Sequence, residues 1–172
     1  MEKANVVLTG FMGTGKSTVG RLLAARLAFD FVDTDELIVE RDGRAIATIF
    51  REAGQAAFRQ WEAIIAQELA GRTRLVIATG GRLMLDEANA AALSRNGHVF
   101  CLTAVPDTIL TRLVGDGGGR PLLDVTDPAQ VIMDLLVERR EGYGRFLQIS
   151  TDNKTPEQIV EEIEERIGIA RG

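Results

Sequence analysis

The sequence lacks the features of a secreted or membrane protein. Its 172 residues include one cysteine, Cys101, so no disulfide can form within the chain. Cys101 stands in the apolar run HVFCL and is expected to be a buried core thiol. No apolar segment approaches the roughly 18 residues of a membrane-spanning helix, and the apolar stretch in MEKANVVLTG is too short for a signal peptide. We therefore expect a cytoplasmic protein that contacts no membrane.

The chain also lacks a net positive charge. The formal net charge is −5, so no basic field is available for nucleic acid and any phosphate site must be local. Apolar residues make up 45% of the chain and charged residues 26%, which is the balance of a globular protein. With no internal repeat and no linker, we expect one domain over residues 1–172, acting as a monomer on a small molecule.

What the sequence does contain is an alternation of short apolar runs and helical patterns. Strands are expected in NVVLT, FDFVDTD, RLVIA, HVFCLT and LQIST, with helices between them and after the last. Proline stands at the expected start of three helices, at positions 106, 128 and 156. Such an order is typical of an α/β fold in which helices cover both faces of a parallel sheet. The segment GDGGGRPLLDVTDP cannot be regular structure, and we expect it to be a mobile loop.

The motif GFMGTGKS, Gly10 to Ser17, is a complete phosphate-binding loop of the G-x-x-x-x-G-K-[ST] type. It follows an expected strand directly and opens an expected helix, where backbone N–H groups and the helix dipole favour phosphate. Lys16 can reach the β- and γ-phosphates of a nucleoside triphosphate, and the Ser17 hydroxyl is a magnesium ligand. The sequence predicts a site for ATP and Mg²⁺, with these residues at the nucleotide: Gly13, Thr14, Gly15, Lys16, Ser17 and Thr18.

Two fragments suggest a GTPase switch, and neither fits. NKTP begins like the guanine-reading N-K-x-D, but Pro156 cannot supply the carboxylate. DGGG, from Asp116 to Gly119, follows the fourth expected strand, too late in the chain to sense the γ-phosphate.

The segment FVDTDELI places Asp33 and Asp35 two residues apart at the end of a strand. They lie on one side if the chain stays extended there. One can then serve the metal, Asp33, while the other reaches a hydroxyl of the acceptor. Two like charges this close favour a raised pKa for one of them. A helix N-cap role for Thr34 or Asp35 is the alternative interpretation.

Six segments together resemble the shikimate kinase family in order and spacing. They are GFMGTGKSTVGRLLA, FVDTDELI, IFREAGQAAFRQWE, ATGG, RPLL and RREGY, and the resemblance covers the whole chain. It implies a three-layer P-loop kinase with a five-stranded parallel sheet, a helical substrate-binding insert at about residues 34–62 and a flexible lid at about 113–126. Enzymes of that family transfer a phosphoryl group from ATP to the 3-hydroxyl of shikimate, a ring that carries hydroxyls and a carboxylate.

By matching position, the resemblance makes Arg59 and Arg139 the clamps for that carboxylate. Arginine suits the task because its planar fork can meet a carboxylate with two parallel bonds. Glu62 is three residues after Arg59 on the same expected helix and can hold it in place. Arg140 is the neighbouring rival of Arg139. Asp35 would accept the proton of the attacking hydroxyl or only orient it.

The same resemblance assigns the lid and the base contacts. Arg120, in GRPLL, would lie over the transferring phosphoryl group and share with Lys16 the neutralisation of its charge. Arg112 and Pro156 would sandwich the adenine.

The segment LVIATGGR ends a strand where open parallel sheets bind ligands. Gly80 and Gly81 match two of the three family glycines and are expected to form the floor of the acceptor pocket. The third position holds Arg82, where a positive φ would be strained. Either Arg82 points away from an unaltered site, or it adds a cation that shifts the preferred acceptor.

These observations predict a kinase that phosphorylates shikimate with Mg²⁺-ATP. A kinase of the same fold for another hydroxy acid such as gluconate is one alternative. A catalytically silent nucleotide-binding regulatory domain is another, although Lys16, Asp35 and Arg120 are all present.

Overall fold

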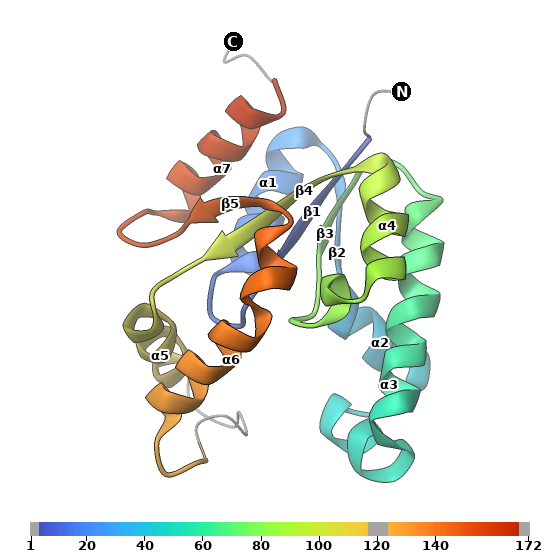
Figure 1. Cartoon of the computed structure of the whole chain (residues 1–172). Coiled ribbons are helices and arrows are strands. Elements are labelled where there is room, and N and C mark those ends of the chain that lie inside the picture. Colours follow the sequence, from blue (N-terminus) through green and yellow to red (C-terminus); the bar gives the residue numbers. More distant parts are fainter. Residues whose placement is uncertain (1–3, 117–123, 169–172) are drawn as a thin grey trace.

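The computed structural model describes residues 4–116 and 124–168, in which strands and helices alternate along the chain (Figure 1). Proline occupies the first turn of the helices that begin at residues 106, 128 and 156, as expected. The elements are β1 (Asn5–Gly10), α1 (Lys16–Leu27), β2 (Asp30–Asp33), α2 (Thr34–Asp42), α3 (Ile46–Ala70), β3 (Leu75–Ala78), the 3₁₀ helix η1 (Leu83–Leu85), α4 (Glu87–Asn96), β4 (Gly97–Thr103), α5 (Pro106–Gly115), α6 (Pro128–Gly144), β5 (Leu147–Ser150) and α7 (Pro156–Arg166).

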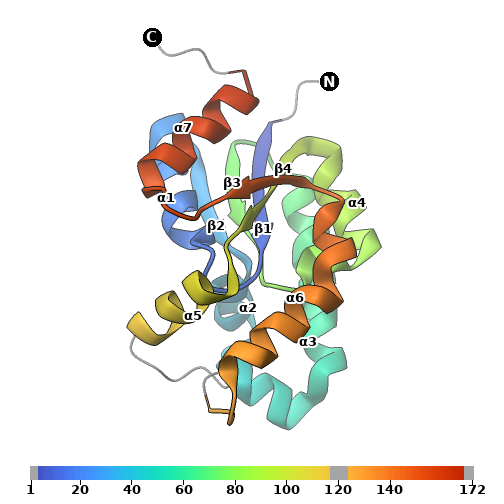
Figure 2. The ribbon, with the colours of Figure 1, turned by 60° about the vertical axis from the view of Figure 1, so that its left-hand side comes forward.

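The five strands form one parallel sheet in the order β2-β3-β1-β4-β5, which confirms the predicted sheet. The central strands β1 and β3 are buried along their whole length, because helices cover both faces. Successive residues point to opposite faces: Val7 packs with α3 and α4, and Leu8 packs with α1 and α7. The three resulting layers are visible in Figure 2, with α1 and α7 on one side of the sheet and α3 and α4 on the other.

Two local features differ from the sequence prediction. The two expected helical stretches over residues 46–71 are joined into α3, which bends at Gly54, where φ is 85° and ψ is 170°. The 3₁₀ helix η1 directly after the Gly80–Gly81 pair had no sequence signal. Cys101 is a buried free thiol, as expected.

The fold places the carboxyl ends of β1, β2 and β3 at one edge of the sheet, from which the phosphate-binding loop and the loop after β3 emerge. This edge is where open α/β sheets bind ligands. Within residues 4–116 and 124–168, no helix is both long and apolar enough to cross a bilayer.

Candidate active site

The phosphate-binding loop has the backbone that its glycines predict. Gly13 and Gly15 have φ of 75° and 93°, a left-handed conformation that other residues adopt only at a cost. A side chain at Gly13 would also meet Leu113 Cδ2 at 3.3 Å. Gly15 is the N-cap of α1 and makes no side-chain cap, so the first N–H groups of the helix have no side-chain acceptor there. This arrangement favours an anion.

Lys16 is folded over the loop that precedes it. Its Nζ donates to the carbonyl oxygens of Gly10 at 2.7 Å and Phe11 at 2.9 Å. Burial lowers the pKa of Lys16 to about 8, although the nearby Asp35 carboxylate opposes this shift. The hydrogen-bond partners of the Lys16 ammonium are neutral carbonyl oxygens, which do not balance its charge. A phosphate would be a stronger partner because it is charged.

Ser17 and Asp33 lie together at the start of α1 and the end of β2. The Ser17 hydroxyl donates to Asp33 Oδ2 at 2.8 Å, while Asp33 Oδ1 accepts from the backbone N–H of Asp35 and Glu36. Asp33 is thus the N-cap of α2, so the alternative interpretation, in which Thr34 or Asp35 caps the helix, is wrong. The chain also does not stay extended through Asp35, because α2 begins at Thr34.

The separation of α1 from β2 depends on a glycine contact. A Cβ on Gly20 would lie 2.6 Å from the Phe31 ring of β2 and 3.5 Å from Leu8 Cδ1. The Arg21 guanidinium covers the same ring, 4.5 Å from its centroid. Because Gly20 has no side chain, α1 approaches β2 closely without displacing the Phe31 ring, and Ser17 lies within hydrogen-bond distance of Asp33.

A cavity of about 780 Å³ opens between the phosphate-binding loop, β2 and the loop after β3. Ten of its lining residues are among those predicted from the sequence: Gly13, Gly15, Lys16, Ser17, Thr18, Asp33, Asp35, Gly80, Gly81 and Arg112. The other lining residues are Met12, Glu36, Ala78, Thr79 and Asp116. Thr14 is buried instead, and its hydroxyl donates to the Phe11 carbonyl oxygen at 2.7 Å.

Asp35 stands on α2 directly against the loop after β3. A Cβ at Gly80 would lie only 2.5 Å from Asp35 Oδ1, and the Gly80 N–H donates to Thr34 Oγ1 at 2.9 Å. Burial and the neighbouring Asp33 raise the pKa of Asp35, while Lys16 and Arg59 oppose the shift. The raised pKa expected from the two carboxylates is confirmed, with burial as the larger cause.

Arg59 is held on α3 by the residue that the sequence predicted. Its Nη1 donates to Glu62 Oε2 at 2.5 Å, and the Glu62 side chain is 3% exposed. Burial raises the pKa of Glu62, and the Arg59 guanidinium opposes this shift. The guanidinium also lies 5.4 Å from the centroid of the Phe58 ring. These contacts fix the arginine close enough to Asp35 to influence its pKa, although Arg59 does not line the large cavity.

Arg139 reaches the same floor from α6. A Cβ at Gly81 would lie 3.2 Å from Arg139 Nη1, and the guanidinium lies 5.3 Å from the centroid of the Phe11 ring. Tyr143, one turn later, donates its hydroxyl to the Gly81 carbonyl oxygen. Arg140 points elsewhere and lines a separate cavity of about 150 Å³ behind the phosphate-binding loop. Of the two adjacent arginines, Arg139 therefore faces Gly81.

Two buried polar atoms flank the Gly80–Gly81 pair. Asp35 Oδ1 and Arg139 Nε have no hydrogen-bond partner in the part of the chain that the structure describes. Buried polar atoms are almost always paired in folded proteins. Asp35 lines the large cavity and Arg139 lies against Gly81, which also lines it, so the two unpaired atoms favour a polar ligand there.

Arg82 adopts an ordinary backbone conformation, with φ of −112° and ψ of −7°, so its position carries no strain. Its Nη1 lies 3.5 Å from Glu138 Oε1 on α6, and the two side chains are 42% and 58% exposed. Arg82 does not line the large cavity. The side chain is turned toward α6 beside Arg139.

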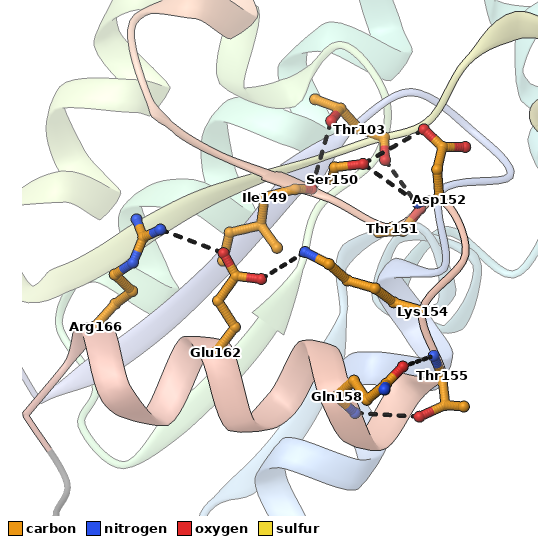
Figure 3. A network of polar contacts seen from close by, with 10 residues as sticks. All are labelled: Thr103, Ile149, Ser150, Thr151, Asp152, Lys154, Thr155, Gln158, Glu162 and Arg166. Carbon is orange, nitrogen blue, oxygen red and sulfur yellow. Dashed lines mark hydrogen bonds and ion pairs between the residues drawn. The ribbon is translucent and has the colours of Figure 1, made fainter.

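Arg112 links the phosphate-binding loop to the loop that leads to Pro156. Its guanidinium donates to the carbonyl oxygens of Gly13 and Thr151 and to the Thr151 hydroxyl, at 2.9 to 3.2 Å. Figure 3 shows how the second loop is fixed: Thr151 Oγ1 donates to the Thr103 carbonyl oxygen, and a capping box between Thr155 and Gln158 opens α7. Pro156 is the first residue of α7 but does not line the cavity.

Arg120 lies outside the described residues, as do residues 117–123 of the expected lid. Several contacts at the site had no sequence signal. Phe11 lies beside Arg139 and Phe58 beside Arg59, Thr34 binds Gly80, and Glu138 pairs with Arg82. These contacts join segments far apart in the chain, apart from Phe58 with its neighbour Arg59. Only a three-dimensional arrangement could identify them.

A G-x-x-x-x-G-K-S loop after β1, with an aspartate of β2 beside its serine, defines a P-loop nucleotide-binding protein. The shikimate kinase family model matches residues 12–168. Shikimate kinase of Thermus thermophilus is 43% identical over 94% of this chain and 89% of its own. The chain belongs to the shikimate kinase family.

The solved structures agree with this assignment. The structure of shikimate kinase from Acinetobacter baumannii in complex with shikimate has a TM-score of 0.88 and 35% identity, and the match covers 96% of this chain and 93% of that one. A gluconokinase from Sinorhizobium meliloti has a TM-score of 0.61 at 19% identity, covering 96% of this chain and 92% of that one. The second likeness shows the shared fold alone.

Proposed function

We propose that this protein transfers a phosphoryl group from ATP to the 3-hydroxyl of shikimate, giving ADP and shikimate 3-phosphate. The observation that carries this proposal is the pair of unpartnered buried atoms beside the two-glycine floor. Asp35 Oδ1 adjoins Gly80 and the Arg139 guanidinium adjoins Gly81. A hydroxyl and a carboxylate on one small ring would complete both. Membership of the shikimate kinase family and the likeness to a shikimate-bound enzyme support the same acceptor.

Each predicted site residue then has a distinct task. The Lys16 ammonium would exchange its two carbonyl partners for the transferring phosphoryl group and neutralise part of its charge. Arg120 would add a second cation there. Asp35 would orient the attacking hydroxyl and take its proton, and its raised pKa suits that transfer. Arg59 and Arg139 would grip the acceptor carboxylate, with Gly80 and Gly81 beneath the ring.

Ser17 and Asp33 fit a magnesium site because both offer hard oxygen atoms at the start of α1. Magnesium keeps several waters and is usually held by one or two protein ligands together with the phosphates. The bound ion would neutralise phosphate charge. Ser17 would turn its hydroxyl from Asp33 to the ion, and Asp33 would keep Oδ1 on the N-terminus of α2.

The organisation of the domain follows from these assignments. We propose that residues 1–172 form one catalytic unit, with residues 34–62 as the substrate-binding insert and 113–126 as a lid that excludes water. Arg112 and Pro156 would hold the adenine, because Arg112 already ties the phosphate-binding loop to the segment before α7. Both sides of the site come from one chain, which suits a monomer. The composition of the chain supports a cytoplasmic location.

The proposal is tested by ADP release with Mg²⁺-ATP and a panel of hydroxy acids. Shikimate should support turnover, with an equivalent yield of the 3-phosphate by NMR. Turnover with gluconate alone would instead assign a different acceptor to the same fold. If no acid supports turnover while calorimetry still detects ATP binding, the chain is a silent nucleotide-binding domain and the proposal is wrong.

A further inference from the structure

Arg82 places an additional guanidinium beside the acceptor side of the site. It follows directly on Gly80 and Gly81, which line the cavity, and its ion-pair partner Glu138 directly precedes Arg139 on α6. The backbone of Arg82 is unstrained, with φ of −112° and ψ of −7°. Arg82 does not line the cavity itself, but it adjoins the two glycines that do. We call the surface formed by Arg82 and Glu138 the rim.

The rim ion pair is too weak to be the main support of α6. Its atoms are 3.5 Å apart and both side chains are about half exposed, so the pair contributes roughly 0–1 kcal/mol. Other bonds already join α6 to this loop and its neighbour η1. The Tyr143 hydroxyl donates to the Gly81 carbonyl oxygen, and Arg145 Nη2 donates to the Met84 carbonyl oxygen at 3.1 Å. We therefore expect the role of Arg82 to lie in its positive charge and not in the attachment of α6.

The charge of Arg82 influences residues on both α3 and α6. Burial raises the pKa of Glu62 on α3, and Arg82 adds to the opposing effect of Arg59. Burial also raises the pKa of Tyr143 on α6, and Arg82 adds there to the opposing effect of Arg139. The Arg82 guanidinium is therefore close enough to act electrostatically on Glu62, which pairs with Arg59, and on Tyr143, which binds the Gly81 carbonyl oxygen.

We propose that Arg82 is a specificity-determining cation of the acceptor site, and that Glu138 occupies it until an acidic acceptor arrives. The acceptor carboxylate would compete with Glu138 for Arg82. The rim would therefore change the affinity for the acid and leave the rate of phosphoryl transfer unchanged. This inference rests on the proposed function in one respect, namely that the acceptor is an acid.

Single and double exchanges of the rim residues test the proposal through the acceptor KM. Glu138→Gln should lower the acceptor KM by roughly three-fold and Arg82→Gln should raise it by roughly three-fold, with kcat little changed. In the double variant, the effect of Glu138→Gln should largely disappear, because it acts through Arg82. Arg82→Lys keeps the charge and should retain most of the affinity.

Glu68→Gln is a matched control, because it breaks an ion pair of similar exposure, Arg41–Glu68, between α2 and α3. The acceptor KM should not change. The rim effects should also shrink when the salt concentration is raised from about 0.05 M to about 0.5 M. Binding of the acceptor, followed by the fluorescence of Trp61, gives the same comparison without turnover.

The proposal is overturned if Glu138→Gln raises the KM as Arg82→Gln does, since the pair would then position α6. It is equally overturned if neither exchange changes the KM beyond the control. The proposed function fails separately, by absence of shikimate turnover in the unmodified protein. The rim exchanges can be compared with whichever acid the unmodified protein binds.

Discussion

The nucleotide side of the site is continuous in sequence, whereas the acceptor side is assembled from distant segments. Residues Gly10 to Ser17 form the phosphate-binding loop, and its anion-binding groups are mostly backbone amides. Arg59, Gly81 and Arg139 come instead from α3, the loop after β3 and α6. A local motif therefore determines the first side, while the packing of the whole domain determines the second.

The two sides also handle charge differently. Lys16 has only neutral carbonyl partners in the described protein, and burial lowers its pKa to about 8. Arg59 is already paired with the buried Glu62. Among the described residues, the nucleotide side thus has two cations without a bonded carboxylate, Lys16 and Arg112, whereas Arg59 on the acceptor side is held by one. This difference predicts that nucleotide-side changes will affect chemistry and acceptor-side changes will affect affinity.

Replacing Lys16 should have the largest effect. Lys16→Met removes the cation nearest the transferring phosphoryl group and should lower kcat by about 10³-fold. Shikimate binding, measured by Trp61 fluorescence, should be retained because the acceptor side is assembled elsewhere. A kcat within about ten-fold of the unmodified protein would contradict the role given to Lys16.

Removing a clamp should act on affinity. Arg139→Ala should raise the KM for shikimate by roughly 10²-fold, because the acceptor carboxylate would lose a charge-assisted bond. ATP binding, measured by calorimetry, should stay near normal. Arg140→Ala is the matched control and should change the KM little, since Arg140 faces the smaller cavity. Equal losses of ATP and shikimate binding would show that Arg139 is not a clamp.

The two floor glycines separate chemistry from affinity at adjacent positions. A methyl group on Gly80 would meet Asp35 Oδ1 at 2.5 Å, so Gly80→Ala should displace this carboxylate and lower kcat by up to about 10²-fold. A methyl group on Gly81 would meet Arg139 Nη1 at 3.2 Å, so Gly81→Ala should raise the shikimate KM more than it lowers kcat. Steady-state kinetics of both variants test this prediction. It is contradicted if Gly80→Ala mainly raises the shikimate KM and Gly81→Ala mainly lowers kcat.

The pH dependence of ATP affinity tests the lowered pKa of Lys16. The charged form binds the triphosphate and predominates below pH about 8, so affinity should be highest there and fall as the pH rises. Between pH about 7 and 9, the ATP dissociation constant should rise by about ten-fold. Cys101 does not interfere, because burial raises its pKa to about 11. Calorimetry should find no such step with Lys16→Met, and a step in that variant would assign the titration to another group.

The sequence was sufficient for the features that depend on local order. The alternation of apolar runs and helical patterns predicted the parallel sheet, and the loop motif predicted the cavity residues on the nucleotide side. The i, i+3 spacing of Arg59 and Glu62 predicted their ion pair, because helical residues three apart are neighbours.

The features that depend on contact between distant segments could not be predicted in this way. Asp33 caps α2 because the helix begins one residue after it, and strand spacing alone suggested an extended chain. The two candidate orientations of Arg82 could not be separated without Glu138, which lies 56 positions later in the sequence. The choice between Arg139 and Arg140 likewise needed the packing of α6 against Gly81.

Gly20 determines a distance in a site that it never touches. If the residue carried a methyl group, the Phe31 ring would have to swing aside or α1 would be wedged away from β2. In the second case Ser17 would be drawn off Asp33, although every letter of the phosphate-binding motif was still in place. A chain can therefore carry the complete motif and still be a poor kinase, because of one methyl group three residues further along the same face of the helix.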